Sequence, residues 1–101
     1  MSVKGVNQTL YVGQNGIRIE YGSILRKDIK ISYDILDIIK YRYADNLGNG
    51  YMTFITNSGY TYTFSYGKIS NEPMTRAVTY IKDHSPSTFM ELNDQVSPHT
   101  K

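Results

Sequence analysis

Hydrophobic and polar residues alternate in a series of short runs between about residue 8 and residue 66. In the clearest run, Ile17, Ile19 and Tyr21 fall on one face and Arg18 and Glu20 on the other, as a half-buried strand requires. Turn-forming sequences that contain glycine or asparagine separate most of the runs, and a short step or turn at Asp34–Asp37 separates the third from the fourth. This pattern predicts six strands, at about 8–12, 17–21, 28–33, 38–43, 51–56 and 60–66.

The period then changes from that of a strand to that of a helix. Four apolar residues spaced at i, i+3, i+4 and i+7 form one stripe that can cover a sheet: Met74, Ala77, Val78 and Ile81. Asn71 is a favourable N-cap residue, and Ser85-Pro86 ends the pattern. The spacing therefore predicts one helix at about 71–83.

The length of 101 residues suits one domain. We place this domain at residues 1–84 and expect residues 85–101 to form a mostly flexible tail, because that segment is polar and contains two prolines. Within it, we expect Phe89-Met90-Glu91-Leu92 to dock weakly on the domain or on a partner.

The composition excludes several classes of function. The chain has no cysteine, which rules out disulfides, thiolate metal sites and a cysteine nucleophile. The N-terminus is not followed by the apolar segment of a secretory signal, and no apolar run is long enough to cross a bilayer. We therefore expect a soluble, cytoplasmic protein. Its richness in Ile, Tyr, Asn and Lys favours the AT-rich codons of a low-GC bacterium or its phage.

Two segments carry a resemblance to a known family. The phrase Lys30-Ile31-Ser32-Tyr33-Asp34-Ile35-Leu36-Asp37-Ile38, the glycine-introduced strand Gly50-Tyr51-Met52-Thr53-Phe54 and the final helix resemble the bacterial pleckstrin-homology-like (PH-like) domains. The resemblance implies a mainly β (α+β) fold, a bent barrel of six to seven antiparallel strands capped by one C-terminal α-helix. The residues left for a seventh strand are Ser23–Leu25 or Ile35–Leu36.

The resemblance also bears on function. Eukaryotic relatives bind phosphoinositides, phosphotyrosine peptides or protein partners, and many bacterial members have no established ligand. Phosphoinositide binding needs several Lys or Arg around the first hairpin, and the loop Gly13-Gln14-Asn15-Gly16 has none. We therefore do not expect this protein to bind a phosphoinositide or a membrane.

Residues suited to catalysis or metal binding are sparse. His84 and His99 lie far apart in sequence without a third partner, and Asp34, Asp37 and Asp45 lack the spacing of a calcium loop. No phosphate-binding loop, nucleophile elbow or zinc motif is present. We expect no catalytic residue, no metal and no cofactor, and therefore no enzymatic activity.

Basic residues recur on the polar faces of the predicted strands and at one turn. Together they form a possible basic stripe: Arg18, Arg26, Lys27, Lys30 and Lys40. Cations interleaved with tyrosines can hold single-stranded nucleic acid. Acidic residues are interspersed, however, and the net charge is only +2, so a solvated strand face is the simpler interpretation and we do not expect nucleic-acid binding.

Ten tyrosines are the unusual feature of the composition. Six fall on inward strand positions, and so many hydroxyls cannot be buried without partners. We expect some to reach the surface at a sheet edge, where tyrosine suits protein interfaces. The predicted partner-binding residues are Tyr41, Arg42, Tyr43, Tyr51, Tyr60 and Tyr62.

Two functions follow from these patterns. The first is a non-enzymatic protein-binding module that acts through the tyrosine-rich edge, with a homodimer as one form of it. The alternative is a small phage or mobile-element protein that inhibits a host factor such as a defence nuclease.

Overall fold

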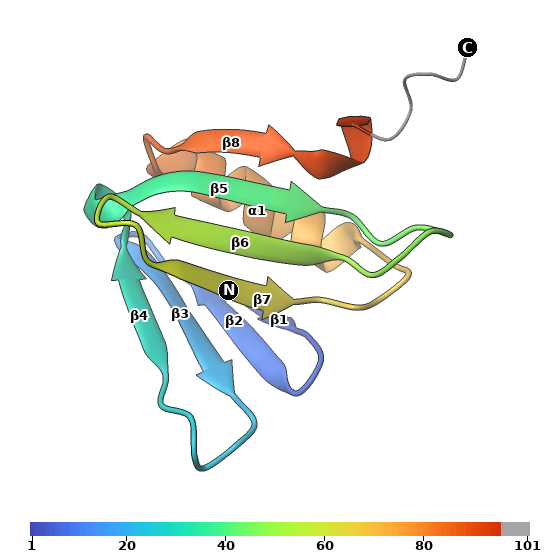
Figure 1. Ribbon diagram of the computed structural model, residues 1–101, viewed down its shortest axis with the longest axis horizontal. Coiled ribbons are helices and arrows are strands. Elements are labelled where there is room, and N and C mark those ends of the chain that lie inside the picture. Colours follow the sequence, from blue (N-terminus) through green and yellow to red (C-terminus); the bar gives the residue numbers. More distant parts are fainter. Residues whose placement is uncertain (96–101) are drawn as a thin grey trace.

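The computed structural model describes residues 1–95, in which eight strands form two four-stranded sheets beside one α-helix (Figure 1). The elements are β1 (Ser2–Lys4), β2 (Gln8–Val12), β3 (Gly16–Tyr21), β4 (Ile29–Ser32), the 3-10 helix η1 (Tyr33–Ile35), β5 (Leu36–Arg42), β6 (Tyr51–Thr56), β7 (Thr61–Ser65), α1 (Glu72–His84), β8 (Thr88–Glu91) and the 3-10 helix η2 (Leu92–Gln95). All six predicted strands and the predicted helix are present. The prediction of a mainly β domain with one C-terminal helix is confirmed.

The two sheets meet at a corner and splay apart from it. The first sheet has the order β1-β2-β3-β4 and is antiparallel throughout. The second has the order β7-β6-β5-β8, in which β8 runs parallel to β5 and the other pairs are antiparallel. Figure 1 shows α1 behind the second sheet, and neither sheet closes on itself. No helix within residues 1–95 is long and apolar enough to cross a membrane.

The core lies between the sheets and the helix. The alternation predicted from the sequence holds in β2, β3, β6 and β7, whose inward apolar positions are buried except for the half-buried Tyr21 and Tyr62. The helix also buries the predicted stripe of Met74, Ala77, Val78 and Ile81. Phe54 and Phe64 are fully buried and fill the centre of the second sheet's inner face.

Neither proposed seventh strand exists, because one segment forms a turn between β3 and β4 and the other spans the corner between the sheets. Ser23–Leu25 belongs to a turn, in which the Arg26 N–H donates to the Ser23 carbonyl at 3.2 Å. Ile35 ends η1, and Leu36 is the first residue of β5, followed by a register shift before Ile38. The additional strand of the first sheet is β1, which contains a single buried residue and therefore has no alternating pattern to predict it.

Buried tyrosine hydroxyls find hydrogen-bond partners, as expected. The Tyr33 hydroxyl donates to the Gly13 carbonyl at 2.7 Å, and the Tyr66 hydroxyl donates to the Ser70 carbonyl at 2.5 Å. Burial raises the pKa of Tyr33 to about 12. No buried side-chain polar atom lacks a partner within the described part of the chain.

Two asparagines fasten the end of β5. The Asn71 side chain accepts the Ala44 N–H and donates to the Ala44 carbonyl, both at 2.9 Å. In the same way, the Asn93 side chain accepts the Tyr43 N–H at 2.6 Å and donates to the Tyr43 carbonyl at 3.1 Å. Asn71 does occupy the N-cap position of α1, but its side chain makes no capping hydrogen bond, since it is committed to Ala44.

The segment after α1 contains a strand that the sequence did not predict. Phe89, within the segment expected to dock weakly, packs against the core from β8. The Ser87 hydroxyl donates to the Leu36 carbonyl at 3.1 Å and fixes the start of this strand. Its positions alternate between exposed and half-buried, but the sequence Thr-Phe-Met-Glu places its two apolar residues side by side, so no alternating sequence pattern marks the strand. Residues 96–101 of the expected flexible tail, including His99, lie outside the described residues.

Candidate protein-binding surfaces

The six predicted partner-binding residues do not form one surface. Tyr41 and Tyr43 lie on the inner side of β5, and their rings meet edge to face with centroids 5.6 Å apart. Tyr41 is only 4% exposed, and its hydroxyl accepts a hydrogen bond from the Lys82 ammonium at 3.1 Å. This hydrogen bond raises the pKa of Lys82. Tyr41 is therefore part of the contact between the second sheet and α1, and a partner cannot reach it.

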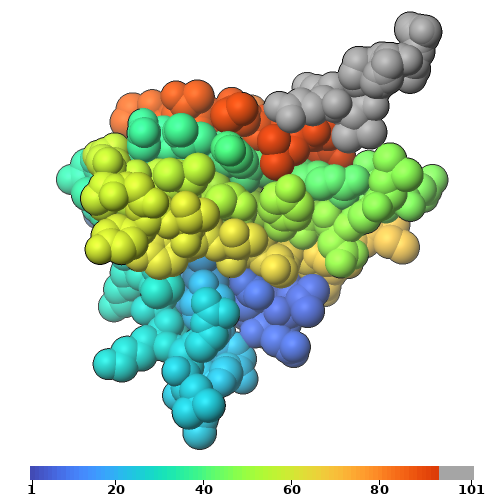
Figure 2. All heavy atoms as spheres, in the orientation of Figure 1, coloured from blue at the N-terminus to red at the C-terminus, as the bar shows by residue number. Residues whose placement is uncertain are grey.

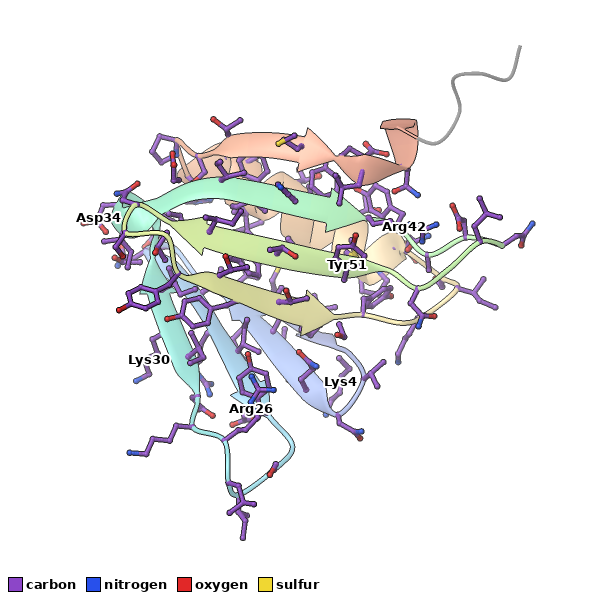
Figure 3. The ribbon with its side chains drawn as sticks, in the orientation of Figure 1. Lys4, Arg26, Lys30, Asp34, Arg42 and Tyr51 are labelled. Carbon is purple, nitrogen blue, oxygen red and sulfur yellow. The ribbon has the colours of Figure 1, made fainter. Side chains whose placement is uncertain are left out.

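Arg42 organises the loop between β5 and β6. Its guanidinium forms an ion pair with Asp45 at 2.8 Å and donates to the Asn49 carbonyl at 3.0 Å. Hydrogen bonds from the Leu47 N–H and the Arg42 side chain hold the pKa of Asp45 below its usual value. Tyr51 is the cross-strand neighbour of Arg42 on the outer face of the second sheet (Figure 3).

Tyr60 and Tyr62 are the two tyrosines that the structure brings to a sheet edge. Tyr60 is 65% exposed in the turn before β7, and Tyr62 is half-buried within β7. They flank Thr61, and Thr63 follows; both threonines are exposed. This end of β7 is the part of the tyrosine prediction that forms an accessible edge.

The backbone of this edge is unpaired. The Ser65 carbonyl accepts the Val6 N–H at 2.9 Å, and the Ser65 N–H donates to the Gln8 side chain at 3.2 Å, so the backbone groups of Ser65 point away from β6. Groups on alternate residues of an antiparallel strand point the same way. The N–H and C=O groups of Thr61 and Thr63 therefore also point outward, and within residues 1–95 nothing bonds to them there.

Charge distinguishes β7 from the other terminal strands. An edge strand is protected from unwanted pairing by charged residues, proline or bulges. The remaining terminal strands, β1, β4 and β8, each contain a charged residue: Lys4, Lys30 and Glu91. The β7 sequence Thr-Tyr-Thr-Phe-Ser has none. Of the four strand edges in the described structure, β7 is thus the one left open to pairing.

The predicted basic stripe divides among three places. Arg18 and Lys30 are cross-strand neighbours on the outer face of the first sheet, whereas Lys40 lies on the second sheet. Arg26 turns back so that its guanidinium lies 3.7 Å from the centroid of the Tyr21 ring, and Lys27 follows it in the β3–β4 loop. These cations do not form one stripe, because the corner at η1 places β3 and β4 in one sheet and β5 in the other. The sequence shows the order of these strands but not the sheet that each one joins.

Arg18 is already neutralised. It contacts Asp28 at 2.9 Å and Glu20 at 3.4 Å, and it covers the Tyr11 ring at 4.0 Å. The hydrogen bond to Asp28 is the main reason that the pKa of Arg18 is raised. A continuous phosphate-binding track therefore has no support from these cations.

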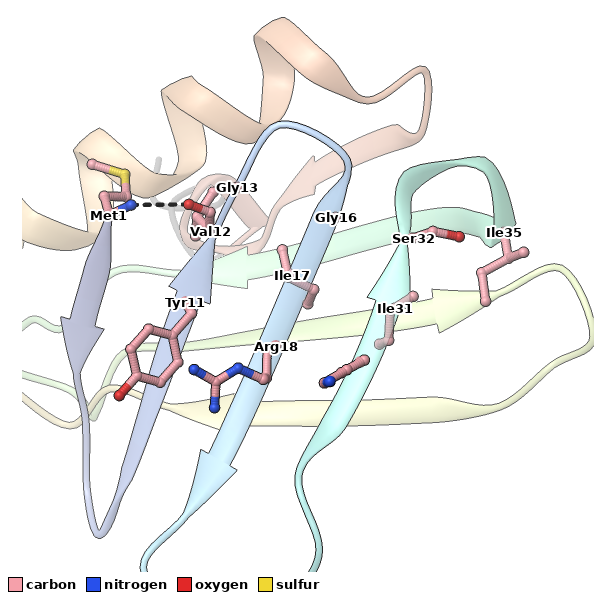
Figure 4. A pocket seen from close by; sticks show the side chains of 11 residues that line it. Met1, Tyr11, Val12, Gly13, Gly16, Ile17, Arg18, Ile31, Ser32 and Ile35 are labelled. Carbon is pink, nitrogen blue, oxygen red and sulfur yellow. Dashed lines mark hydrogen bonds between the residues drawn. The ribbon is translucent and has the colours of Figure 1, made fainter.

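A shallow depression of about 700 Å³ lies on the outer face of the first sheet (Figure 4). Met1, Tyr11 and Ile35 contribute apolar walls, and Gly16 leaves the floor open. The glycine is needed for packing, since an added Cβ would lie 2.2 Å from the Ile31 carbonyl oxygen. The depression is open to solvent and holds no unpartnered buried polar group to orient a ligand.

The acidic and histidine side chains do not assemble into a site. Within residues 1–95, no group of three His, Asp or Glu is placed to hold a metal ion. Asp34 accepts a short hydrogen bond from the Ser32 hydroxyl at the corner. His84 stacks on Tyr80 with centroids 4.1 Å apart, and its Nδ1 is 2.8 Å from the Tyr80 carbonyl oxygen. Their positions serve local structure.

The first hairpin of the structure differs from the one assumed for phosphoinositide binding. Because β1 precedes β2, the first hairpin loop is Gly5–Asn7, and Gly13–Asn15 connects β2 to β3. Neither loop contains a basic residue.

A scan against protein-family models finds no match to this chain, and a search of curated proteins finds none that matches it. The surfaces described above therefore carry the functional interpretation by themselves.

Proposed function

We propose that this protein is a non-enzymatic protein-binding module that takes up an extended segment of a partner protein along the free edge of β7. One observation carries the proposal: the outward N–H and C=O groups of Thr61 and Thr63 lie on an exposed, uncharged strand edge. An added strand would satisfy these groups, in the way that β-strand addition gains affinity from main-chain hydrogen bonds. Tyr60 and Tyr62 flank the edge and offer apolar area with a polar tip to the partner's side chains.

The chemistry of the edge favours a segment with little charge. Thr61 and Thr63 are neutral, and the strand end is closed by Val6 and Gln8 through their bonds to Ser65. About three residues of β7 are free, so affinity must come from side-chain contacts as well as from the backbone. A second copy of the chain can pair with the same edge, which gives the homodimer form of the proposal.

The order of elements supports kinship with PH-like domains. Four antiparallel strands, a sharp corner, three antiparallel strands and a C-terminal helix follow each other in that sequence, with β8 as an addition. We propose a PH-like fold on this basis, together with the cytoplasmic location expected from the sequence. In such a fold the helix covers one opening between the sheets and leaves strand edges elsewhere for binding.

Thr63→Pro tests the proposal directly. Proline removes the outward N–H of residue 63, and that N–H has no internal partner to lose. Peptides are selected from a displayed library on the wild-type protein, and their affinity for each variant is then measured. We expect Thr63→Pro and Thr63→Lys to weaken binding at least about tenfold, which corresponds to about 1.4 kcal/mol.

Thr53→Lys is the matched control. Thr53 is the cross-strand partner of Thr63 on the same outer face, but it belongs to the central strand β6. This variant should bind like the wild type. Equal binding by wild type and both Thr63 variants would refute the edge as the binding site.

The inhibitor hypothesis makes a separate prediction in the same system. Capture from a host lysate with the wild type and with Thr63→Lys would then recover a single defence nuclease with the wild type alone. Self-association that disappears in Thr63→Lys, measured by light scattering, indicates the homodimer instead.

A further inference from the structure

Two large aliphatic side chains stand fully in solvent at the tip of the β3–β4 loop. Ile24 is 102% exposed and Leu25 is 89% exposed. All residues of the loop, 22–28, are exposed, and the loop projects from the body of the protein (Figure 2). Exposed aliphatic residues are common singly, whereas two consecutive ones at a projecting tip need a reason.

The loop is built to hold this tip in place. The Ser23 hydroxyl accepts the Leu25 N–H at 3.1 Å, and the Ser23 carbonyl accepts the Arg26 N–H at 3.2 Å, so a tight turn presents Ile24 and Leu25 at its apex. At the base, the Gly22 N–H donates to the Asn7 carbonyl at 2.7 Å. Arg26 stacks on Tyr21 below the turn. The aliphatic pair is therefore displayed by an ordered turn.

Positive side chains outnumber the negative ones, Glu20 and Asp28, at the same end of the protein. Arg26 and Lys27 directly follow the aliphatic pair, and neither forms an ion pair within residues 1–95. Lys4 and Lys30 add positive charge on the first sheet (Figure 3). The only acidic residue of the loop, Asp28, is bound to Arg18.

The N-terminal part of the chain, which forms the first sheet, is also more positively charged than the rest. Residues 1–35 contain five basic and three acidic side chains, whereas residues 36–95 contain five basic and six acidic ones. The positive excess thus lies on the sheet that carries the loop. An apolar tip with adjacent cations complements a surface that is apolar beneath and negative on top.

We propose that the β3–β4 loop docks on a lipid bilayer that contains anionic headgroups. Ile24 and Leu25 enter the boundary between headgroups and acyl chains, while Arg26 and Lys27 contact lipid phosphates. The expectation against membrane binding concerned the loop between β2 and β3, which lies at the opposite end of β3 from this tip. Membrane docking leaves the β7 edge free, and it does not depend on the proposed strand addition.

Vesicle binding tests the proposal with the whole chain. The wild type should co-sediment with vesicles of phosphatidylcholine mixed with phosphatidylserine, more weakly with phosphatidylcholine alone, and less as salt is raised. Ile24→Ser with Leu25→Ser should lower the partition coefficient at least about tenfold. Lys27→Gln should lower binding to anionic vesicles and leave binding to neutral ones unchanged.

A matched control uses two other exposed aliphatic residues. Leu47 is 74% exposed and Ile69 is 90% exposed, and they lie in the β5–β6 and β7–α1 loops, away from the β3–β4 tip (Figure 1). Leu47→Ser with Ile69→Ser should bind vesicles like the wild type. An equal loss in both double variants would overturn the assignment to this loop, as would absence of wild-type binding to anionic vesicles.

A fluorescence measurement places the tip itself. The chain has no tryptophan, so Ile24→Trp introduces a single reporter. Its emission should shift to the blue on anionic vesicles, whereas that of Ile69→Trp should stay unchanged. Emission at position 24 that shifts with a purified protein partner and not with vesicles would assign the loop to protein binding and refute the membrane proposal.

Discussion

Asn71 offers a sharp test of how the helix and the second sheet are joined. In the structure its side chain binds the backbone of Ala44 through two hydrogen bonds of 2.9 Å and makes no capping bond to α1. A sequence-based interpretation treats the same residue as an N-cap. The two roles predict different results for replacements that are themselves good N-caps, namely Asn71→Ser and Asn71→Asp.

The magnitudes separate the two roles. If Asn71 acts as a cap, serine and aspartate replace it with a change of only a few tenths of a kcal/mol. Each part-buried hydrogen bond to Ala44 contributes about 0.5–1.5 kcal/mol. Serine is too short to make both, so Asn71→Ser should cost about 1–3 kcal/mol. Aspartate loses the donor and places a carboxylate oxygen against the Ala44 carbonyl, which outweighs its favourable interaction with the helix dipole of about 0.3–1 kcal/mol.

Urea unfolding followed by circular dichroism measures the difference. We expect both variants to lower the midpoint with an unchanged slope, and to lower the melting temperature by about 4–8 °C for each kcal/mol lost. Thr75→Ala is the control variant. It removes the hydrogen bond from the Thr75 hydroxyl to the Asn71 carbonyl, at 2.9 Å, and leaves the contact between Asn71 and Ala44 intact. Variants as stable as the wild type would show that the Ala44 contact contributes nothing and refute this reasoning.

Two further predictions concern Tyr33 and Asn93. Since burial raises the pKa of Tyr33 to about 12 while an unfolded tyrosine titrates near 10, its contribution to stability is complete below pH 10 and is lost as the pH rises towards 12. Tyr33→Phe should therefore reduce the fall in unfolding free energy across that interval, and an unchanged fall would contradict the assignment. Asn93→Ala removes the side-chain bonds to Tyr43 and should lower the unfolding free energy by about 1–3 kcal/mol. Hydrogen exchange in β8 should accelerate more than in β6, and equal acceleration in both strands would show that Asn93 does not hold β8 specifically.

Alternation and helical spacing were sufficient to predict most of the fold. The inward residues of β3 and the buried stripe of α1 could be identified because one side of each element faces the core. β1 and β8 were missed for a physical reason: the first has only Val3 buried, and the second has no fully buried residue and two adjacent apolar residues, Phe89 and Met90, in place of an alternating pattern. A strand that buries so few side chains has no clear sequence pattern, and only its pairing with a neighbouring strand in the structure identifies it.

The candidate sites were harder to predict, because a sequence does not show which sheet a strand joins. Arg18 and Lys40 have the same pattern of flanking residues, yet the corner at η1 places them on different sheets. Tyr41 and Tyr60 likewise share a residue type, whereas one is buried against α1 and the other is exposed in a turn. The only sequence feature that indicates the unpaired backbone edge of β7 is the absence of charged residues on that strand.

The parallel pairing of β8 has a consequence for how the chain acquires its structure. Ile38 pairs with Thr88, so this contact closes a long loop, whereas the hairpins on either side of β6 close short ones. Long closures cost more chain entropy and form later. We therefore expect the edge of β5 that pairs with β8 to be covered late in folding, once α1 has formed. Until then, Ile38–Tyr41 would present an unpaired strand edge that another chain or a chaperone can bind.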